Sequence, residues 1–114
     1  MLLSVPELVA QAKSSITCVS ATHAYSRKNA IIIDVREAGE TATSPVANSI
    51  AIPRGVLEMN IATHCTDAEV EIFIHCASGG RAALAAEQLQ RIGYKNVKAI
   101  SNSHAEVCQA QKNQ

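Results

Sequence analysis

Short apolar runs, several of them rich in β-branched residues, recur along the chain. The clearest are AIIIDV from Ala30, SIAIP from Ser49 and VEIFIHC from Val70. An unbroken apolar run is typical of a strand that is buried on both faces of a parallel sheet. Two further runs, ITCVS from Ile16 and NVKAI from Asn96, have the length of short strands. These runs predict the strands of one sheet.

Helical patterns fill several of the segments between these strands. SVPELVAQAK places Ser4 and Glu7 at capping-box spacing and predicts a helical extension in residues 1–15. Ser20 precedes the weaker pattern ATHAYSRK. RAALAAEQLQRIG is rich in helix formers and ends at Gly93, and SHAEVCQAQKNQ predicts a terminal helix. Alternating strands and helices predict an α/β fold, with a mainly parallel central sheet flanked by helices on both faces.

Length and composition favour one domain over residues 1–114, because 47% of the residues are hydrophobic and can form a core. Ten basic residues balance ten acidic ones, so no net charge draws the chain to nucleic acid or to a membrane. The first residues lack the pattern of a secretory signal, and no apolar run is long enough to span a bilayer. We therefore expect a soluble, cytoplasmic protein with reduced cysteines.

The segment HCASGGRAALAAE contains the strongest candidate for chemistry. Asp34 and Cys76 both end predicted strands, and ligands of parallel sheets bind at the carboxyl ends of strands. A helix begins soon after Cys76, and a helix N-terminus offers unpaired N–H donors that stabilise a thiolate and bind an anion. The expected substrate-binding residues are Ala77, Ser78, Gly79, Gly80 and Arg81.

Two features of this loop support a functional interpretation of Cys76. Gly79 and Gly80 permit positive φ angles and a close approach of backbone donors to the sulfur, and Arg81 can fork onto an anionic substrate. A cysteine alone is more often a buried core residue, and a Gly-Gly pair alone often marks a turn. The combination between a buried strand and a good helix favours a nucleophile.

These residues resemble a known family. HCASGGRAALAAEQLQRIGYKNV resembles the active-site loop and following helix of single-domain rhodaneses, IIIDVRE resembles their first signature, and IAIPRGVLEM resembles the segment after their second strand. The resemblance runs from about Ile16 to the C-terminus and implies a rhodanese-like fold. It also implies a thiosulfate sulfurtransferase, in which Cys76 takes the sulfane sulfur of an anionic donor as a persulfide. Thioredoxin or glutathione would be a suitable thiol acceptor, and no metal or organic cofactor is required.

Two alternatives to sulfur transfer remain at this point. Related dual-specificity phosphatases carry one more residue between cysteine and arginine, so the shorter loop from Cys76 to Arg81 favours sulfur over phosphate. A phosphatase or arsenate-reductase-like enzyme is therefore the weaker alternative. The other is a non-catalytic rhodanese-like module that binds a partner protein, against which the intact Cys76 and Arg81 argue.

The chain departs from the family pattern in two places. Residues 44–49, SPVANS, replace the frequent stretch Gly-His-Ile-Pro-Gly-Ala. Asn102, Ser103 and Val107 stand where a Gly-Gly pair and a tryptophan are familiar. The departures concern the rim of the expected pocket rather than its nucleophile, so substrate preference does not carry over from the family.

Several polar residues near the predicted site have two interpretations. Asp34 and Arg36 either shape the pocket or form a structural pair at a strand end. Arg54 either faces the pocket and attracts an anionic donor or is a solvated surface residue. Glu37 and Glu40 are interpreted as charges at a helix start rather than as catalytic acids.

The remaining histidines and cysteines give weaker signals. We interpret His75 as a packing residue, because successive strand residues point to opposite faces. The pairs His64-Cys65 and His75-Cys76 lack the usual ligand spacing of zinc sites. Cys65 is a candidate resolving thiol for an oxidised Cys76, whereas Cys18 and Cys108 are interpreted as structural or incidental.

Overall fold

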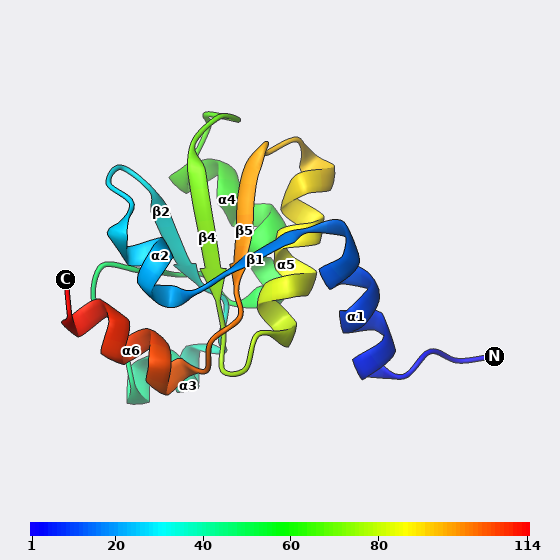
Figure 1. Cartoon of the computed structure of the whole chain (residues 1–114). Helices are drawn as coiled ribbons and strands as arrows, with labels where there is room; N and C mark the ends of the chain where they lie inside the picture. Colours follow the sequence, from blue (N-terminus) through cyan, green and yellow to red (C-terminus); the bar gives the residue numbers. More distant parts are fainter.

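The computed structural model describes residues 1–114, and its strands form one parallel sheet (Figure 1). The strand order is β1-β5-β4-β2-β3, so that β4 lies in the middle. This arrangement confirms the predicted α/β fold with a parallel sheet. The strands are β1 Thr17–Val19, β2 Ile31–Asp34, β3 Ile50–Ala51, β4 Glu71–His75 and β5 Asn96–Ile100.

Helices cover both faces of the sheet (Figure 1). One apolar cluster joins α4 and α5 to one face, and a second joins α2 and α6 to the other. The first helix, α1, packs mainly on α5. The helices are α1 Val5–Ser15, α2 Ala21–Ser26, α3 Ala38–Thr43, α4 Leu57–His64, α5 Gly80–Ile92 and α6 His104–Lys112, and a single 3-10 turn, Arg54–Val56, precedes α4.

The central strand β4 divides its side chains between the two clusters. Ile72 and Ile74 belong to the α4–α5 cluster, while Phe73 belongs to the α2–α6 cluster. This alternation follows from the two-residue period of a strand. The alternation extends past the strand. Cys76 belongs to the α4–α5 cluster, whereas His75 lies on the opposite face of the sheet, near His104 of α6.

Serine caps begin three of the helices. Ser4 and Glu7 form the predicted capping box of α1, and Ser20 accepts the hydrogen bond of His23 N–H at the start of α2. Ser103 forms a capping box with Glu106, the third residue of α6. Each cap satisfies an amide that the helix leaves unpaired.

Two sequence-based expectations about the middle of the chain need correction. The apolar run from Ser49 forms only a two-residue strand, β3, at the edge of the sheet. Helix α4 follows it but was not predicted, because the helix starts at Leu57 with no side-chain cap and no helical signal stands out before it. Leu57 and Ile61 of α4 are buried in the α4–α5 cluster.

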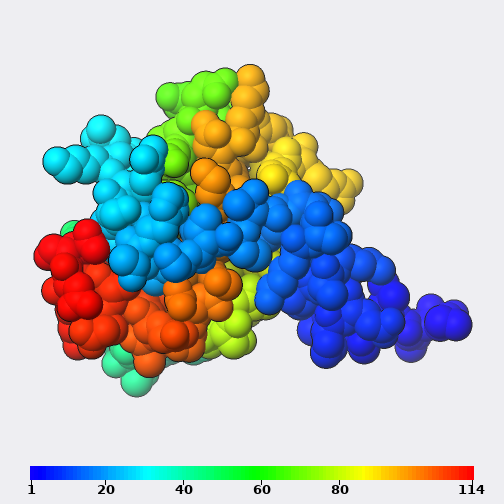
Figure 2. All heavy atoms as spheres, viewed as in Figure 1, coloured from blue at the N-terminus to red at the C-terminus, as the bar shows by residue number.

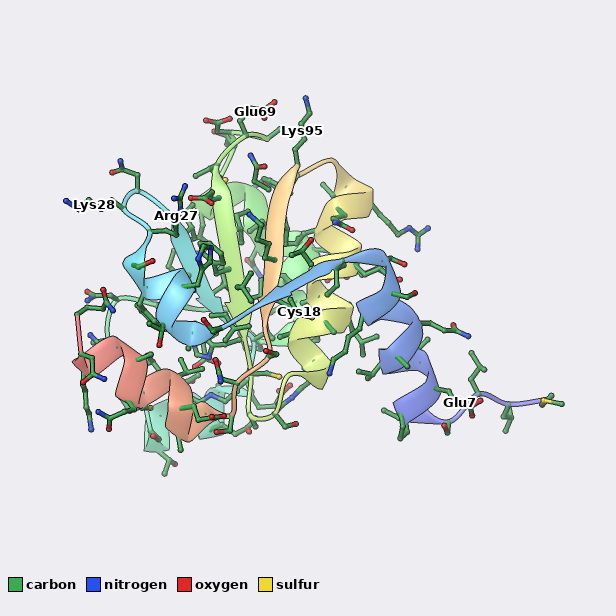
Figure 3. All side chains as sticks on the ribbon, in the orientation of Figure 1. Glu7, Cys18, Arg27, Lys28, Glu69 and Lys95 are labelled. Carbon is green, nitrogen blue, oxygen red and sulfur yellow. The ribbon has the colours of Figure 1, made fainter.

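The two ends of the sheet differ in character. At the amino end, Lys95 and Glu69 form an exposed ion pair of 2.9 Å just before β5 and β4 (Figure 3). The loops at the opposite end connect β4 to α5 and β2 to α3.

The first residues project from the body beyond α1 (Figure 2), with Met1 and Leu2 exposed. No helix has the length and apolar character needed to cross a membrane.

Candidate active site

The loop between β4 and α5 wraps its backbone around the sulfur of Cys76. The Sγ atom accepts a hydrogen bond of 3.1 Å from the amide of Gly79 and one of 3.3 Å from the amide of Ala82. Ala82 lies in the first turn of α5, where amides have no partner within the helix. The sulfur therefore occupies the anion position of a helix N-terminus.

This geometry refines the predicted set of donors. The expected donors were the amides of residues 77–81, whereas the two that reach the sulfur belong to Gly79 and Ala82. Ala82 lay outside the predicted range because the prediction ended at Arg81. The helix begins at Gly80, and the amide of Ala82 in its first turn still reaches the sulfur. Ser78 is exposed, and Ala77 is half-buried.

Cys76 lies deeper than a position at the mouth of a loop would suggest. Only 1% of the residue is exposed, and it belongs to the apolar cluster under α5. Two backbone donors in a water-poor setting stabilise a charged sulfur more effectively than the same donors in water. A reaction partner has to approach Sγ past the side chains that surround the loop.

The two glycines of the loop serve different purposes. Gly79 has φ 99°, which disfavours any residue with a side chain, and it is the residue that precedes α5. Gly80 has no positive φ and begins the helix, which corrects the expectation that both glycines adopt such angles. A Cβ atom at Gly80 would lie 3.6 Å from a methyl group of Val9 in α1. Gly80 thus lies where α1 packs on α5.

Neighbouring elements hold the loop in place. The carbonyl oxygen of Ala77 accepts a 2.9 Å hydrogen bond from the amide of His104, the first residue of α6. A Cβ atom at Gly79 would meet the carbonyl oxygen of Ser101, just past β5, at 3.6 Å. The nucleophile loop is therefore braced by the end of β5 and the start of α6.

Arg81 is paired with a carboxylate from the other side of the site. Its guanidinium donates to both carboxylate oxygens of Glu40 in α3, at 2.6 and 3.1 Å. The pKa of Arg81 is raised, mainly by the hydrogen bond to Glu40, and a negative charge on the nearby Cys76 acts in the same direction. The Arg81 hydrogen bond in turn lowers the pKa of Glu40 to about 2. Both charges persist across the neutral pH range.

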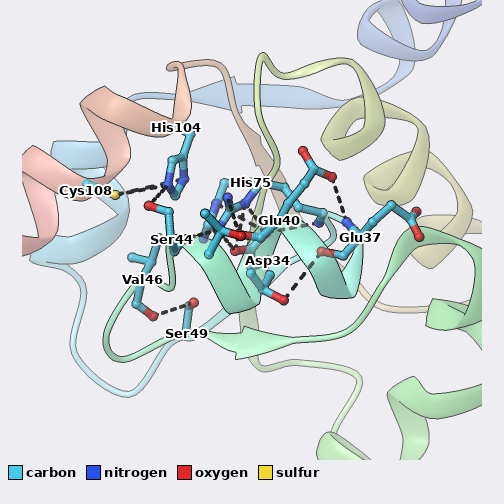
Figure 4. A network of polar contacts seen from close by, with 12 residues as sticks. Asp34, Glu37, Glu40, Ser44, Val46, Ser49, His75, His104 and Cys108 are labelled. Atoms are coloured by element: carbon cyan, nitrogen blue, oxygen red, sulfur yellow. Dashed lines mark hydrogen bonds and ion pairs between the residues drawn. The ribbon is translucent and has the colours of Figure 1, made fainter.

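Glu40 has more roles than the expected one. It does form the predicted helix-start interaction, because its carboxylate accepts the amide hydrogen of Glu37 at 2.9 Å (Figure 4). Its contact with Arg81 was missed. The two residues lie 41 positions apart, and no local pattern signals such a pair.

Asp34 and Arg36 form the structural pair that was one of their two interpretations. The guanidinium of Arg36 donates to both oxygens of Asp34, with a shortest distance of 2.7 Å, and its remaining donors reach the carbonyls of Ser44 and Glu40. Asp34 and Arg36 are 1% and 3% exposed. The partners of Arg36 leave little of the guanidinium for a substrate, so the structure favours a role in holding the segment after α3.

Arg54 lies at the same edge of the sheet but also has a partner. Its amide donates to the carbonyl of Val35, which brings the residue beside the end of β2. Its guanidinium donates to both oxygens of Glu58, one turn further along the chain, at 2.9 and 3.1 Å. Neither of the two earlier interpretations included this ion pair.

His75 is fully buried, and neither of its ring nitrogens has a hydrogen-bond partner. Burial is the main cause that lowers its pKa to about 4, and the Asp34 carboxylate, 4.0 Å from Nδ1, opposes that shift only in part. The imidazole is neutral at pH 7. The hydrogen-bond donors of the Cys76 sulfur are backbone amides, so the structure gives His75 no hydrogen bond to the nucleophile.

The altered rim segment has its own set of contacts. His104 of α6 lies between Ser44, at 2.9 Å from Oγ, and Cys108, at 3.4 Å from Sγ (Figure 4). Burial lowers the pKa of His104, and the charge of Arg36 adds to this effect. Asn48 adopts φ 62°, a conformation that asparagine tolerates better than most residues, at the position of the second glycine in the family stretch.

Cys65 and Cys18 lie away from the Cys76 loop. Cys65 lies at the end of α4, where its thiol contacts the carbonyl of Asp67 and its own carbonyl accepts a hydrogen bond from Tyr94. This is the amino end of β4, whose length separates Cys65 from Cys76 by roughly 15 Å. This separation argues against a role for Cys65 as the resolving thiol of Cys76. Cys18 is exposed in the edge strand β1 (Figure 3).

The family model of the rhodanese-like domain matches residues 20–110. The chain belongs to the rhodanese-like family. Among solved structures, a polysulfide-sulfur transferase homodimer from Wolinella succinogenes is 27% identical, with a TM-score of 0.75 over 90% of this chain and 80% of that one. A rhodanese-related protein from Thermoplasma volcanium is 26% identical, with a TM-score of 0.69 over 82% and 91%.

A third structure has the same fold under a different description. A protein of unknown function from Rhodopseudomonas palustris, described as a possible tyrosine phosphatase, has a TM-score of 0.81 over 96% of this chain and 92% of that one. Its identity of 24% supports a shared fold and nothing further. No curated protein matches the chain.

Proposed function

We propose that the protein is a sulfurtransferase that carries a sulfane sulfur as a persulfide on Cys76. The observation that carries this proposal is the pair of backbone hydrogen bonds on Sγ, from Gly79 and Ala82. Fixed donors at a helix N-terminus stabilise both a thiolate and the terminal sulfur anion of a persulfide. These amides already point at the sulfur before its charge forms. Because they need not reorient, they lower the activation barrier of sulfur transfer.

The first half-reaction loads the sulfur. The Cys76 thiolate attacks the outer sulfur of a donor such as thiosulfate, and a bond forms between Sγ and that sulfur. The sulfur–sulfur bond of the donor breaks, and its electron pair leaves with sulfite. The product is a Cys76 persulfide anion. Charge is conserved, and no proton has to move, which agrees with the lack of a hydrogen-bonded base at Sγ.

The second half-reaction returns the enzyme to its starting state. A thiophilic acceptor, either cyanide or a thiolate such as that of glutathione or thioredoxin, attacks the outer sulfur of the persulfide. The bond to Sγ breaks, and the electron pair stays on Cys76 as the regenerated thiolate. The backbone amides of Gly79 and Ala82 stabilise this leaving group.

The structural comparison supports sulfur rather than phosphorus chemistry. The similar Wolinella succinogenes protein is a polysulfide-sulfur transferase. The phosphatase description belongs to a protein with 24% identity. The loop has four residues between Cys76 and Arg81, one fewer than in the related dual-specificity phosphatases. The loop length and the similarity to a sulfur transferase therefore both favour a sulfurtransferase over a phosphatase.

The proposal is tested by steady-state transfer from thiosulfate to cyanide, measured as thiocyanate. We expect turnover by the native chain and by Cys18→Ser, whose thiol is exposed on an edge strand, and no turnover by Cys76→Ser. A parallel assay with a phosphate ester should show no hydrolysis. Turnover that survives in Cys76→Ser would overturn the proposal, and Cys76-dependent ester hydrolysis without sulfur transfer would favour the phosphatase.

A further inference from the structure

Each arginine at the carboxyl edge of the sheet is paired with a carboxylate of the same chain. The shortest distances within these pairs are between 2.6 and 2.9 Å. A small anion that approaches the loop thus meets no guanidinium that lacks a partner. The pairs are Arg36 with Asp34, Arg54 with Glu58, and Arg81 with Glu40.

The three pairs differ in how readily they can open. Arg36 is buried and also donates to two carbonyls, so its release would leave several buried groups unpaired. Arg81 and Glu40 have side chains that are 34% and 37% exposed, and water can replace their contact. An exposed ion pair is worth little net free energy, so an incoming anion can displace it. Arg54 and Glu58 are also partly exposed, at 23% and 36%, but they lie in the segment after β3 and not on the loop of Cys76.

Arg81 is also placed to meet a substrate at the nucleophile. It is the second residue of α5 and lies within one turn of both amides that bind Sγ. A negative charge on Cys76 raises the pKa of Arg81, so the guanidinium lies within electrostatic reach of the sulfur. Glu40 comes from α3, on the other side of the loop, so its carboxylate occupies the donors that Arg81 would otherwise offer to an anion.

We propose that Glu40 determines donor specificity by competing with anionic sulfur donors for Arg81. This inference rests on the proposed sulfurtransferase function. A donor with two negative charges, such as thiosulfate, has to displace the Glu40 carboxylate before Arg81 can bind it. A donor with less charge relies less on Arg81 and suffers less from the competition, so the site discriminates against highly charged donors.

Glu40 is well suited to act as a permanent competitor. Its two oxygens match the guanidinium fork, and one of them is also held by the amide of Glu37. Because its pKa is lowered to about 2, the carboxylate stays ionised at any pH at which the enzyme would work. The competition is therefore a constant property of the site rather than a pH-dependent one.

The test compares Glu40→Gln with Glu58→Gln, which removes the same charge from the partner of Arg54. Glutamine at position 40 can still accept the amide of Glu37 and preserves the capping box. The donors are thiosulfate, a dianion, and methanethiosulfonate, a monoanion with the same type of transferable sulfur. We expect Glu40→Gln to lower the KM for thiosulfate by about threefold to fivefold, the worth of an exposed ion pair, with kcat unchanged.

Two further results are expected if the competition operates. The KM for methanethiosulfonate should change less than that for thiosulfate, and Glu58→Gln should leave both values near those of the native protein. Sulfate, which carries no sulfane sulfur, should protect Cys76 from alkylation by iodoacetamide at a lower concentration in Glu40→Gln. This protection is a binding measurement that does not depend on turnover.

The outcomes separate this inference from the proposed function. If the native protein takes sulfur from neither donor, the sulfurtransferase proposal itself fails. If it turns over but Glu40→Gln has an unchanged or higher KM for thiosulfate, Glu40 merely positions Arg81, and the competition is refuted. An equal fall of KM in Glu58→Gln would show a general effect of charge and would refute it as well.

Discussion

The amide of Ala82 donates a 3.3 Å hydrogen bond to the sulfur of Cys76, six residues earlier in the chain. This contact joins the nucleophile to the first turn of α5, so the helix position and the sulfur position depend on each other. The helix is anchored by buried residues such as Ala85, Ala86 and Leu89. The apolar core thereby fixes the donors that stabilise charge on the sulfur.

Gly79→Ala tests how much this arrangement depends on backbone conformation. The native φ of 99° strains any residue with a Cβ atom, although that atom would have ordinary space, 3.6 Å from its nearest neighbour. We expect a loss of about 1–2 kcal/mol in the free energy of unfolding and slower sulfur loading. The slower loading follows because the amide at position 79 shifts away from Sγ. Denaturant unfolding and single-turnover loading measure the two effects.

Gly39→Ala is the matched control for this substitution. Gly39 lies inside α3, has no positive φ, and has no atom within 4 Å of the position that its Cβ would take. Alanine should stabilise the helix by up to about 1 kcal/mol and leave sulfur loading unchanged. Native stability in Gly79→Ala would contradict the assigned role of that glycine.

Arg36→Leu distinguishes a structural arginine from a substrate-binding one. Removal of the guanidinium leaves the Asp34 carboxylate buried without its partner, which costs about 3–5 kcal/mol in comparable pairs. We expect a large fall in the free energy of unfolding, and a smaller one when Asp34→Asn is added. An Arg36→Leu protein of native stability with a raised KM for thiosulfate would instead assign Arg36 to the substrate.

His75 makes the stability of the fold depend on pH in a defined window. The unfolded chain protonates a histidine near pH 6.5, whereas burial lowers the pKa of His75 to about 4 in the folded protein. Above about pH 6.5 both forms are neutral, and the residue contributes no pH dependence. Between about pH 6.5 and 4, only the unfolded chain binds the proton, so the folded protein loses up to about 3 kcal/mol of stability.

His75→Leu should remove this slope. Leucine has a similar size, and it replaces an imidazole whose two nitrogens have no partner, so stability at pH 7 should stay the same or rise. Denaturant unfolding of both proteins from pH 7.5 to about 4.5 measures the difference, with shared carboxylate effects cancelling. A parallel pH dependence in the two proteins would show that His75 does not carry the effect.

Much of the fold could be predicted because the signals are local. The unbroken apolar runs that form β2 and β4 and the capping box at Ser4 each occupy a few neighbouring residues. Helix α4 has no such signal, since Val56 precedes it without a side-chain cap. β3 was overestimated because an apolar run gives no information about how many residues find a partner at the sheet edge.

In the candidate site too, features with a local sequence signal could be predicted and long-range contacts could not. Cys76 and Gly79 could be identified from their spacing to the helix, because the loop closes on itself. The pairing of Arg81 with Glu40 could not, since it joins residues from different layers of the fold that are far apart in the sequence. The depth of Cys76 also depends on packing by α5, which a linear pattern does not report.

The measurement that tests the central proposal most directly is the intact mass of the protein after treatment with thiosulfate in the absence of reductant. The native chain should gain the mass of one sulfur atom, and cyanide should remove it. Cys76→Ser, treated in the same way, should gain nothing, while Cys18→Ser should behave like the native chain. A native chain that gains no sulfur, or a Cys76→Ser protein that gains as much, would contradict a persulfide on Cys76.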